Sequence, residues 1–115
     1  MTYPLRGEVW LVDLGLAAKV RPCVVVSSQI GDQDRALLAI VPHTTSTRGT
    51  AYEANIGVQF LKRGAFDAQG IVTVPVARAV RFLGRLKPEE MRSVELALCQ
   101  WLKLPCGDLN GSDTD

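Results

Sequence analysis

The sequence has few of the residues from which metal centres and disulfide frameworks are built. It contains a single histidine, and its three cysteines, Cys23, Cys99 and Cys106, stand at none of the spacings that zinc ligands use. An odd number of cysteines also argues against a disulfide framework, so we expect Cys23 and Cys99 as small buried hydrophobes. We therefore expect no cofactor, no metal and a reducing compartment, the cytoplasm.

Long apolar runs and familiar catalytic patterns are missing as well. The longest apolar run, residues 36–42, is much shorter than the roughly 18 residues that a membrane span needs. No apolar segment follows Arg6 near the N-terminus, so we expect neither a signal peptide nor a membrane location. There is no glycine-rich phosphate loop before a helix and no pair of histidines, which argues against a metalloenzyme or an oxidoreductase.

The chain does have enough apolar material for one folded domain. Its 115 residues are 47% hydrophobic and 22% charged, and only 6% are aromatic, so we expect an aliphatic core. The net charge of +1 is unevenly spread, with eleven Lys or Arg against six Asp or Glu in residues 1–87. That basic excess suits a polyanionic partner such as nucleic acid, although a solvated surface gives the same count.

Short β-type segments dominate the first three quarters of the sequence. Alternating or continuous runs of Val, Ile and Leu predict strands, and Pro75 precedes a predicted helical turn over 76–80. The predicted strands cover residues 7–14, 23–28, 36–41, 52–58 and 71–74, with loops at 15–22 and 64–70. Many short strands in a small body favour a closed or partly closed barrel, because closure removes exposed strand edges.

The last predicted element is a helix over residues 88–104, which begins with Pro88 in its first turn. Its apolar face at helical spacing consists of Met91, Val94, Leu98, Trp101 and Leu102. We expect this face, and both tryptophans of the chain, to pack in the core. Residues 1–104 then form one domain, and residues 105–115 are predicted to be a disordered acidic tail.

One group of side chains has the chemistry to act on a phosphate. Arg21 precedes Pro22 at the entrance to a predicted strand, and a hydroxyl cluster at 44–47 follows His43 at the exit of another. An arginine fork matches a phosphate group and a threonine hydroxyl donates to a phosphoryl oxygen, so together they would stabilise charge on a transition state. Taken alone, the pattern also fits a surface arginine, an arginine paired with Asp13, or a hydroxyl that caps a turn.

Four ordered blocks of the sequence carry a family resemblance. Residues 7–14 read GEVWLVDL and residues 21–27 read RPCVVVS. Residues 40–46 read IVPHTTS, and residues 83–91 read LGRLKPEEM. In this order the blocks resemble those of the MazF/PemK (Kid) toxins, and together they span nearly the whole chain before the tail.

The resemblance implies a mostly β protein with α, a small SH3-like β-barrel with a long C-terminal helix that forms a homodimer. It implies the toxin of a type II toxin–antitoxin system, a metal-independent, sequence-specific endoribonuclease that cleaves single-stranded mRNA. The 2′-hydroxyl attacks the adjacent phosphate and leaves a 2′,3′-cyclic phosphate and a 5′-hydroxyl. Its partners are then the RNA substrate and a cognate antitoxin whose acidic segment covers the basic groove.

The family pattern assigns Arg21 and Thr45 as catalytic residues. Arg21 serves proton transfer or phosphate stabilisation, and the second role fits better a side chain that stays protonated. Thr45 hydrogen-bonds the pentacoordinate phosphorane. Arg78 and His43 are candidates for a catalytic or phosphate-positioning role, the alternative for His43 being a hydrogen-bonded or partly buried histidine at a strand end. The residues expected to bind RNA are Lys19, Thr44, Ser46 and Arg48, and Thr44 and Ser46 are also alternatives to Thr45.

Three features depart from the family's usual pattern. The loop at 15–20 is shorter than in most members, His43 replaces an aliphatic residue or threonine, and Arg81 stands where many members carry an acid. Two other functions stay open at this point. One is a non-enzymatic gyrase poison like the CcdB toxins, which would need neither Arg21 nor Thr45, and the other is a degenerate member that only binds RNA or antitoxin.

Overall fold

The computed structural model describes residues 3–15, 17 and 19–107, and within them the chain forms one sheet of seven strands and one α-helix. The strands are β1 (Glu8–Asp13), β2 (Val20–Val25), β3 (Leu37–Thr44), β4 (Glu53–Asn55), β5 (Ala65–Asp67), β6 (Val72–Pro75) and β7 (Ala79–Arg85), and the helix is α1 (Pro88–Leu102). Short 3-10 turns, η2 (Ala68–Gly70) and η3 (Val76–Arg78), flank β6. The predicted class, mostly β with a C-terminal helix, is confirmed.

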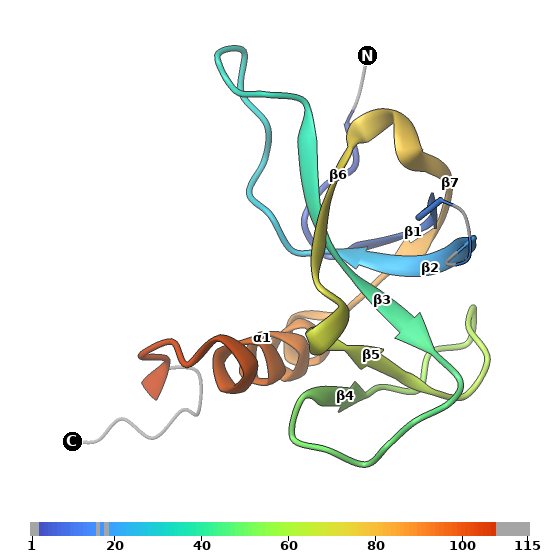
Figure 1. Ribbon diagram of the computed structural model, residues 1–115, viewed down its shortest axis with the longest axis vertical. Coiled ribbons are helices and arrows are strands. Elements are labelled where there is room, and N and C mark those ends of the chain that lie inside the picture. The colour runs from blue at the N-terminus through green and yellow to red at the C-terminus, as the bar shows by residue number, and fades with distance from the viewer. Residues whose placement is uncertain (1–2, 16, 18, 108–115) are drawn as a thin grey trace.

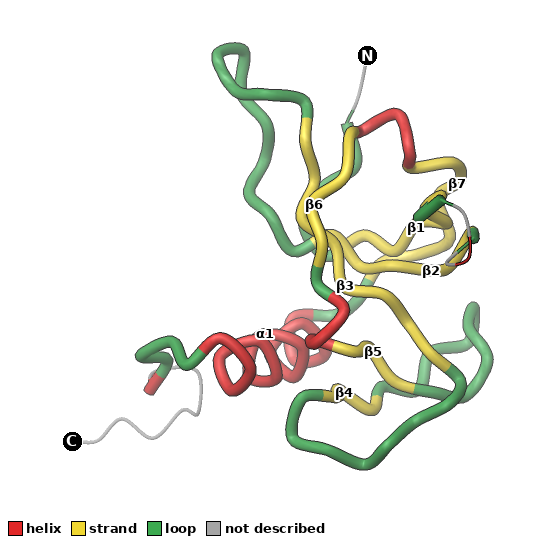
Figure 2. The backbone as a smooth tube through the Cα atoms, viewed as in Figure 1, coloured by secondary structure: helices red, strands yellow, loops and turns green. Residues whose placement is uncertain are grey.

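The strands pair antiparallel in the order β4-β5-β3-β2-β1-β7, and β6 also pairs with β3. The long strand β3 organises this sheet, because it pairs with β6 near its start, with β2 in its middle and with β5 at its end (Figure 1). The terminal strands β4 and β7 do not pair with each other within the described part of the chain, so the sheet does not close there. The β2–β3 connection, residues 26–36, projects well away from the sheet (Figure 2).

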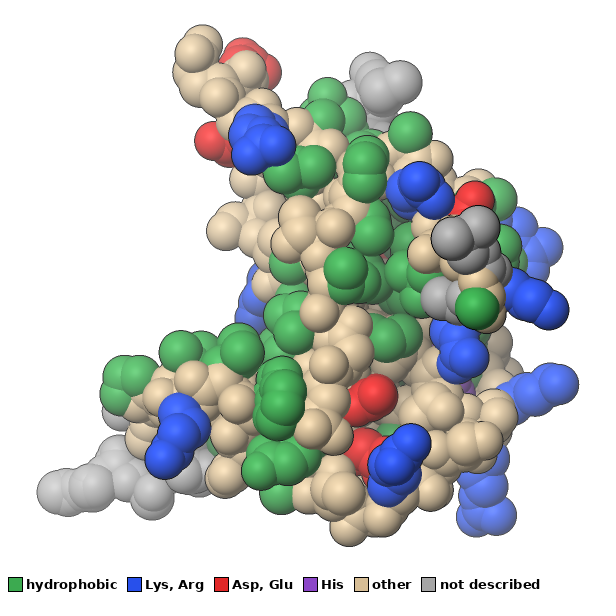
Figure 3. Space-filling model, viewed as in Figure 1, with side chains coloured by type: hydrophobic (Ala, Val, Ile, Leu, Met, Phe, Trp, Pro, Cys, Tyr) green, Lys and Arg blue, Asp and Glu red, His purple; other side chains and the backbone are tan. Residues whose placement is uncertain are grey.

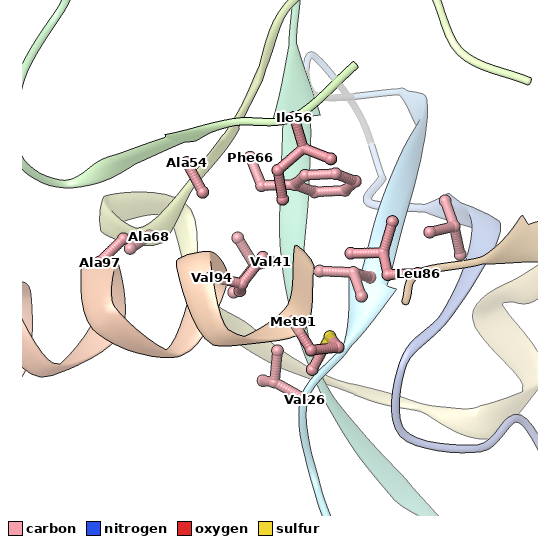
Figure 4. Packing of buried hydrophobic residues seen from close by; sticks show 12 residues of the cluster. Val26, Val41, Ala54, Ile56, Phe66, Ala68, Leu86, Met91, Val94 and Ala97 are labelled. Atoms are coloured by element: carbon pink, nitrogen blue, oxygen red, sulfur yellow. The ribbon is translucent and has the colours of Figure 1, made fainter. Parts of the chain in front are cut away.

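Strand alternation divides the core into two clusters on the two faces of the sheet. Val9, Val24 and Val41 are opposite one another on three neighbouring strands, and they belong to one cluster with residues of α1 and with Phe66 of β5. Figure 4 shows Val41 beside Val94 of α1. The second cluster consists of Val12, Cys23, Val25, Leu38, Ile40 and Val74. Both clusters are dominated by aliphatic side chains, as the low aromatic content predicts.

Helix α1 begins where the sequence predicts, but less of its apolar face is buried than predicted. The Glu90 side chain accepts a hydrogen bond from the Lys87 backbone N–H (2.8 Å) at its start. Met91, Val94 and Ala97 are buried, whereas the second half of the helix runs out beyond the sheet (Figure 1). Trp101 is therefore 40% exposed and lies edge-on to Tyr52 with ring centroids 5.3 Å apart, so its predicted place in the core is wrong.

Several strand boundaries also differ from the predictions. The predicted loop at 64–70 contains β5 and η2, and β7 was not predicted at all. β5 is only three residues long, and β7 carries two arginines and a glycine, so neither has the apolar alternation of a half-buried strand. β2 begins at Val20, which pairs with Asp13, so Arg21 and Pro22 lie inside the strand instead of at its entrance. β3 likewise extends to Thr44.

The cysteines correct a further expectation, because Cys99 and Cys106 form a disulfide with Cα atoms 6.0 Å apart. The chain reverses at Lys103, whose backbone is left-handed (φ 55°), and this reversal brings Cys106 back to the last turns of α1. Cys23 is a buried free thiol, as predicted. The predicted disordered tail at 105–115 is wrong at Cys106, which this disulfide fixes to α1, and residues 108–115 lie outside the described residues.

A buried carboxylate ties the N-terminal segment to the sheet. Glu8, 7% exposed, accepts hydrogen bonds from the Leu5 backbone N–H (2.9 Å), the Trp10 indole (3.0 Å) and the Arg85 guanidinium (2.7 Å). Burial raises the pKa of the Glu8 carboxyl, but these hydrogen bonds outweigh it and leave the pKa below its ordinary value.

No helix in the described ranges is long and apolar enough to cross a membrane.

Candidate functional site

Neighbouring strands bring four residues into one row on a single face of the sheet. Two of them, His43 and Arg81, are positions at which the sequence departs from the family's usual pattern. Leu11 of β1 is opposite Arg81 of β7 on one side and Pro22 of β2 on the other. Continuing the β2–β3 register, in which Cys23 faces Pro42, by one residue puts Pro22 opposite His43. Side chains at opposed positions point to the same face, so this row forms a continuous surface across four strands.

This surface is the floor of a pocket of about 400 Å³, here called the main pocket. Its polar lining comes from Arg21, His43, Thr45, Lys62 and Arg81. The sequence-predicted catalytic pair, Arg21 of β2 and Thr45 just after β3, therefore meets in one place together with His43. Every charged side chain lining the main pocket is a cation, so the pocket favours an anion such as a phosphate.

The remaining wall of the main pocket is apolar. Leu11, Pro22 and Leu83 come from the sheet, and Phe60 and Leu61 come from the β4–β5 connection. That connection is held in place by close backbone packing, because a side chain at Gly84 would come within 2.5 Å of the Phe60 ring. A residue larger than glycine at this point of β7 would push Phe60 off the sheet.

A second pocket of about 370 Å³, the side pocket, opens beside the first and shares Arg21 and His43 with it. Three of the predicted RNA-binding residues, Thr44, Ser46 and Arg48, line it. Two acids also line it, and both already accept backbone hydrogen bonds: Glu53 from Arg48 and Gly49, and Asp67 from Gln69.

The structure distinguishes the neighbouring hydroxyls. The Thr44 hydroxyl oxygen accepts a hydrogen bond from the Ser46 backbone N–H (3.0 Å), so it closes the turn that follows β3. The Thr45 side chain is exposed and lines the main pocket. The turn-capping role considered for Thr45 thus belongs to Thr44, and Thr45 is an exposed residue that lines the main pocket together with Arg21.

Two predicted residues lie apart from both pockets. Arg78, at the end of η3, donates to the Asp13 backbone oxygen (3.4 Å) and lies 3.8 Å from the Asp13 carboxylate, with both side chains about half exposed. Lys19 lies in the β1–β2 turn, where its backbone pairs with Leu14 and Gly15. Neither side chain is part of the lining of the main or the side pocket.

His43 is the most unusual polar group of the site. It is 4% exposed, packs edge-on against Phe66 with ring centroids 5.1 Å apart, and has no hydrogen-bond partner for Nε2 within the described residues. Burial lowers the pKa of the His43 imidazole, so the side chain is neutral at pH 7. Of the two alternatives considered for a strand-end histidine, burial is what the structure shows, and the hydrogen bond is missing at Nε2.

The neighbouring cysteine does not act as a nucleophile here. Burial raises the pKa of the Cys23 thiol to about 12, against the opposing effect of the Arg21 charge. A thiol with this pKa stays protonated and unreactive at neutral pH. Across the described ranges, no three His, Cys, Asp or Glu side chains are grouped to hold a metal ion.

Sequence reasoning missed the residues that complete the main pocket from other parts of the chain. Phe60 and Leu61 belong to a connection with no motif, and Arg81 lies on the unpredicted strand β7. Lys62 of the same connection was considered from the sequence as part of a phosphate track, with a solvated surface charge as the alternative. The departure at Arg81 from the family's usual acid was the one available signal. In Figure 3, Lys and Arg side chains gather along the side of the molecule on which Figure 1 has β1, β2 and β7.

Comparison with known proteins decides the family. A family model described as "PemK-like, MazF-like toxin of type II toxin-antitoxin system" matches residues 5–102. The chain belongs to this toxin family. The predicted resemblance to the MazF/PemK toxins is thereby confirmed.

Curated relatives and solved structures agree with this assignment. The toxin is 31% identical to "Endoribonuclease MazF1" of Mycobacterium bovis over 105 residues, 91% of this chain and 98% of that protein. It is 37% identical to "Probable endoribonuclease MazF5" of Mycobacterium tuberculosis over 100 residues, 83% of this chain and 89% of that protein. A solved "Endoribonuclease in complex with its cognate antitoxin from Mycobacterial species" has a TM-score of 0.77 and 29% identity, covering 89% of this chain and 97% of that one.

Proposed function

We propose that the toxin, an endoribonuclease of its family, cleaves single-stranded mRNA at specific sequences by a metal-independent mechanism. The observation that carries the proposal is the meeting of Arg21 and Thr45 in one pocket whose charged side chains are all cations. Two relatives that match this chain over most of their own length are named endoribonucleases, which supports the same activity. Such a pocket suits a reaction in which negative charge builds up on a phosphate.

The proposed reaction is an intramolecular transesterification. The 2′-oxygen of one ribose attacks the adjacent phosphorus, and the bond from phosphorus to the 5′-oxygen of the next nucleotide breaks. The 2′-hydroxyl loses its proton and the departing 5′-oxygen gains one, so the products are a 2′,3′-cyclic phosphate and a 5′-hydroxyl. Arg21 stabilises the charge of the phosphorane, and the Thr45 hydroxyl donates a hydrogen bond to one of its oxygens.

The RNA chain on either side of the cut is held by the flanking polar groups. Thr44, Ser46 and Arg48 of the side pocket are proposed to contact the backbone of the RNA. Lys19 and Arg78 are proposed to bind phosphates further from the cut, because both are exposed cations outside the two pockets. His43, buried and neutral between the pockets, is proposed to position the substrate and not to transfer protons.

The proposed assembly follows the family. Residues 1–104 form the toxin domain, an SH3-like barrel in its finer classification. A homodimer would cover Val80 and Phe82, which are 61% and 45% exposed on the end strand β7. A cognate antitoxin would cover the cationic pocket with an acidic segment, and the protein would act in the cytoplasm, where mRNA is.

A cleavage assay with purified, antitoxin-free toxin tests the proposal. A long single-stranded RNA is incubated in excess EDTA with wild-type protein, Arg21→Ala and Thr45→Ala, and binding is measured alongside. We expect discrete cuts by the wild type, none by Arg21→Ala and at least tenfold slower cuts by Thr45→Ala, with RNA binding largely kept. Folded wild-type protein that cuts none of several unrelated RNAs would refute the proposal and turn attention to a gyrase-poisoning or binding-only role.

A further inference from the structure

We propose that the main pocket holds one nucleobase of the RNA beside the cut phosphate, and that His43 makes the hydrogen bond that selects this base. The inference rests on the proposed ribonuclease function and adds to it a residue that determines the cleavage sequence. It starts from two features that phosphate binding leaves unexplained, namely the apolar half of the pocket and the unpaired nitrogen of His43.

The apolar part of the main pocket fits a base better than a phosphate. Its volume, about 400 Å³, lies in the range of about 300–1,000 Å³ that small-molecule pockets occupy. Leu11, Pro22, Phe60 and Leu83 supply flat or aliphatic surface, against which a phosphate would gain nothing and the face of a base would pack. The cations Lys62 and Arg81 in the same lining would hold the phosphates attached to that nucleotide.

His43 supplies the polar end of this pocket. Its Nε2 is buried without a partner among the residues described, and leaving a buried polar atom unsatisfied costs roughly 1–3 kcal/mol. A base edge that reaches Nε2 removes this cost, whereas a base with the wrong hydrogen-bonding group leaves it in place. Because the imidazole is neutral at pH 7, it forms one directional hydrogen bond at Nε2 and does not act as a general cation.

The position of His43 puts this hydrogen bond next to the reaction. His43 and Thr45 are two residues apart along the chain at the end of β3, roughly 7 Å by strand geometry, and both line the main pocket. Arg21 reaches the same pocket from the adjacent strand β2. A base on His43 therefore belongs to a nucleotide that flanks the phosphate held by Arg21 and Thr45.

The β4–β5 connection covers the imidazole in the free protein. Gly64 packs so closely that an added side chain would come within 2.8 Å of the His43 ring, and Phe60 lies against Gly84. An entering base must displace part of this cover before it reaches Nε2. The proposal therefore includes a small outward movement of residues 60–64 on RNA binding.

The first test compares cleavage sequences, which a merely structural role would leave unchanged. Wild type, His43→Leu, His43→Gln and a control, Gln69→Leu on the exposed turn η2, each cut an RNA library randomised over several positions, and the new 5′ ends are sequenced. We expect both His43 variants to lose roughly tenfold in base preference at one position flanking the cut, with preferences elsewhere and in the control unchanged. Unaltered preference at every position, with cleavage uniformly slower, would overturn the proposal.

A second measurement uses the wild-type protein and so does not depend on the variants folding. Since the chain has one histidine, the ring nitrogens of His43 give unambiguous ¹⁵N NMR signals. The probe is a short oligonucleotide carrying the wild-type cleavage sequence, made uncleavable by a 2′-deoxy sugar at the cut. We expect the Nε2 signal to shift with this oligonucleotide and to stay in place when the flanking base is absent. Equal shifts with and without the base would refute base reading while leaving the ribonuclease function intact.

Discussion

Replacing Glu8 with glutamine should destabilise the fold in a way that depends on pH. Glutamine keeps an oxygen for the Leu5 N–H and the Trp10 indole but loses the negative charge, and its amide opposes the Arg85 guanidinium. The Arg85 side chain is 63% exposed, so its ion pair is screened and contributes little. Most of the effect comes from the two shielded hydrogen bonds, which become weaker because their acceptor changes from a charged carboxylate to a neutral amide oxygen. We expect a loss of about 1–3 kcal/mol in the free energy of unfolding.

The sign of the pH dependence follows from the lowered pKa of Glu8. The stabilisation by the carboxylate is fully present above its ordinary pKa of 4.5 and is lost as the pH falls through the lower pKa of the folded state. Wild type and Glu8→Gln should therefore differ most at neutral pH and converge in strong acid. At neutral pH the expected difference in melting temperature is roughly 4–12 °C for a domain of this size.

The assay is urea unfolding of both proteins at neutral pH and at several acidic values, followed by tryptophan fluorescence or circular dichroism. The matched control is Asp32→Asn, which removes a carboxylate from an exposed loop and should change the free energy of unfolding by less than about 0.5 kcal/mol. A difference between wild type and Glu8→Gln that stays the same from neutral to acidic pH would refute the reasoning.

Three further predictions concern the disulfide, the pocket cover and the cations. Cys106→Ser opens a closed loop of eight residues, so thermal unfolding should show a loss of at most about 2.5 kcal/mol, while RNA cleavage stays unchanged; a loss of cleavage would contradict the placement of this disulfide away from the site. Gly64→Ala puts a methyl group 2.1 Å from the Thr44 carbonyl oxygen, so it should lower the free energy of unfolding by roughly 1–3 kcal/mol and slow cleavage. A variant as stable as wild type would show that the cover is not closely packed. Arg81→Gln and Lys62→Gln should each reduce the slope of log affinity against log salt by about 0.7 in RNA-binding titrations, as loss of one phosphate contact requires, and unchanged slopes would remove these cations from the RNA path.

Local sequence patterns predicted the elements whose formation depends mainly on neighbouring residues. Strand β1 and the start of α1 at Pro88 follow from alternation and from the acids and proline of a first helical turn. β5 and β7 escaped prediction because they are set by pairing with distant strands. The disulfide escaped it too, because it depends on the left-handed backbone at Lys103, a conformation that its residue type does not indicate.

The site was predictable only in part, because some of its residues are brought together by contacts between distant parts of the chain. Arg21, His43 and Thr45 lie close to one another because two neighbouring strands carry them, and the family's sequence blocks mark the same positions. The pocket wall at Phe60 depends on its contact with Gly84, more than twenty residues away in the sequence, so nothing local points to it. The burial of His43 likewise comes from the cover at 60–64 and from Phe66, and not from its own strand.

The most direct test of the account is the chemistry of the cut itself. An RNA carrying the wild-type cleavage sequence is compared with the same RNA bearing a single 2′-deoxy sugar on the nucleotide before the cut, both in excess EDTA. The account predicts fragments with 5′-hydroxyl and 2′,3′-cyclic phosphate ends from the first RNA, and no cut at that position in the second. Continued cleavage of the 2′-deoxy RNA, or fragments with 5′-phosphate ends, would contradict attack by the 2′-hydroxyl and with it the roles given to Arg21 and Thr45.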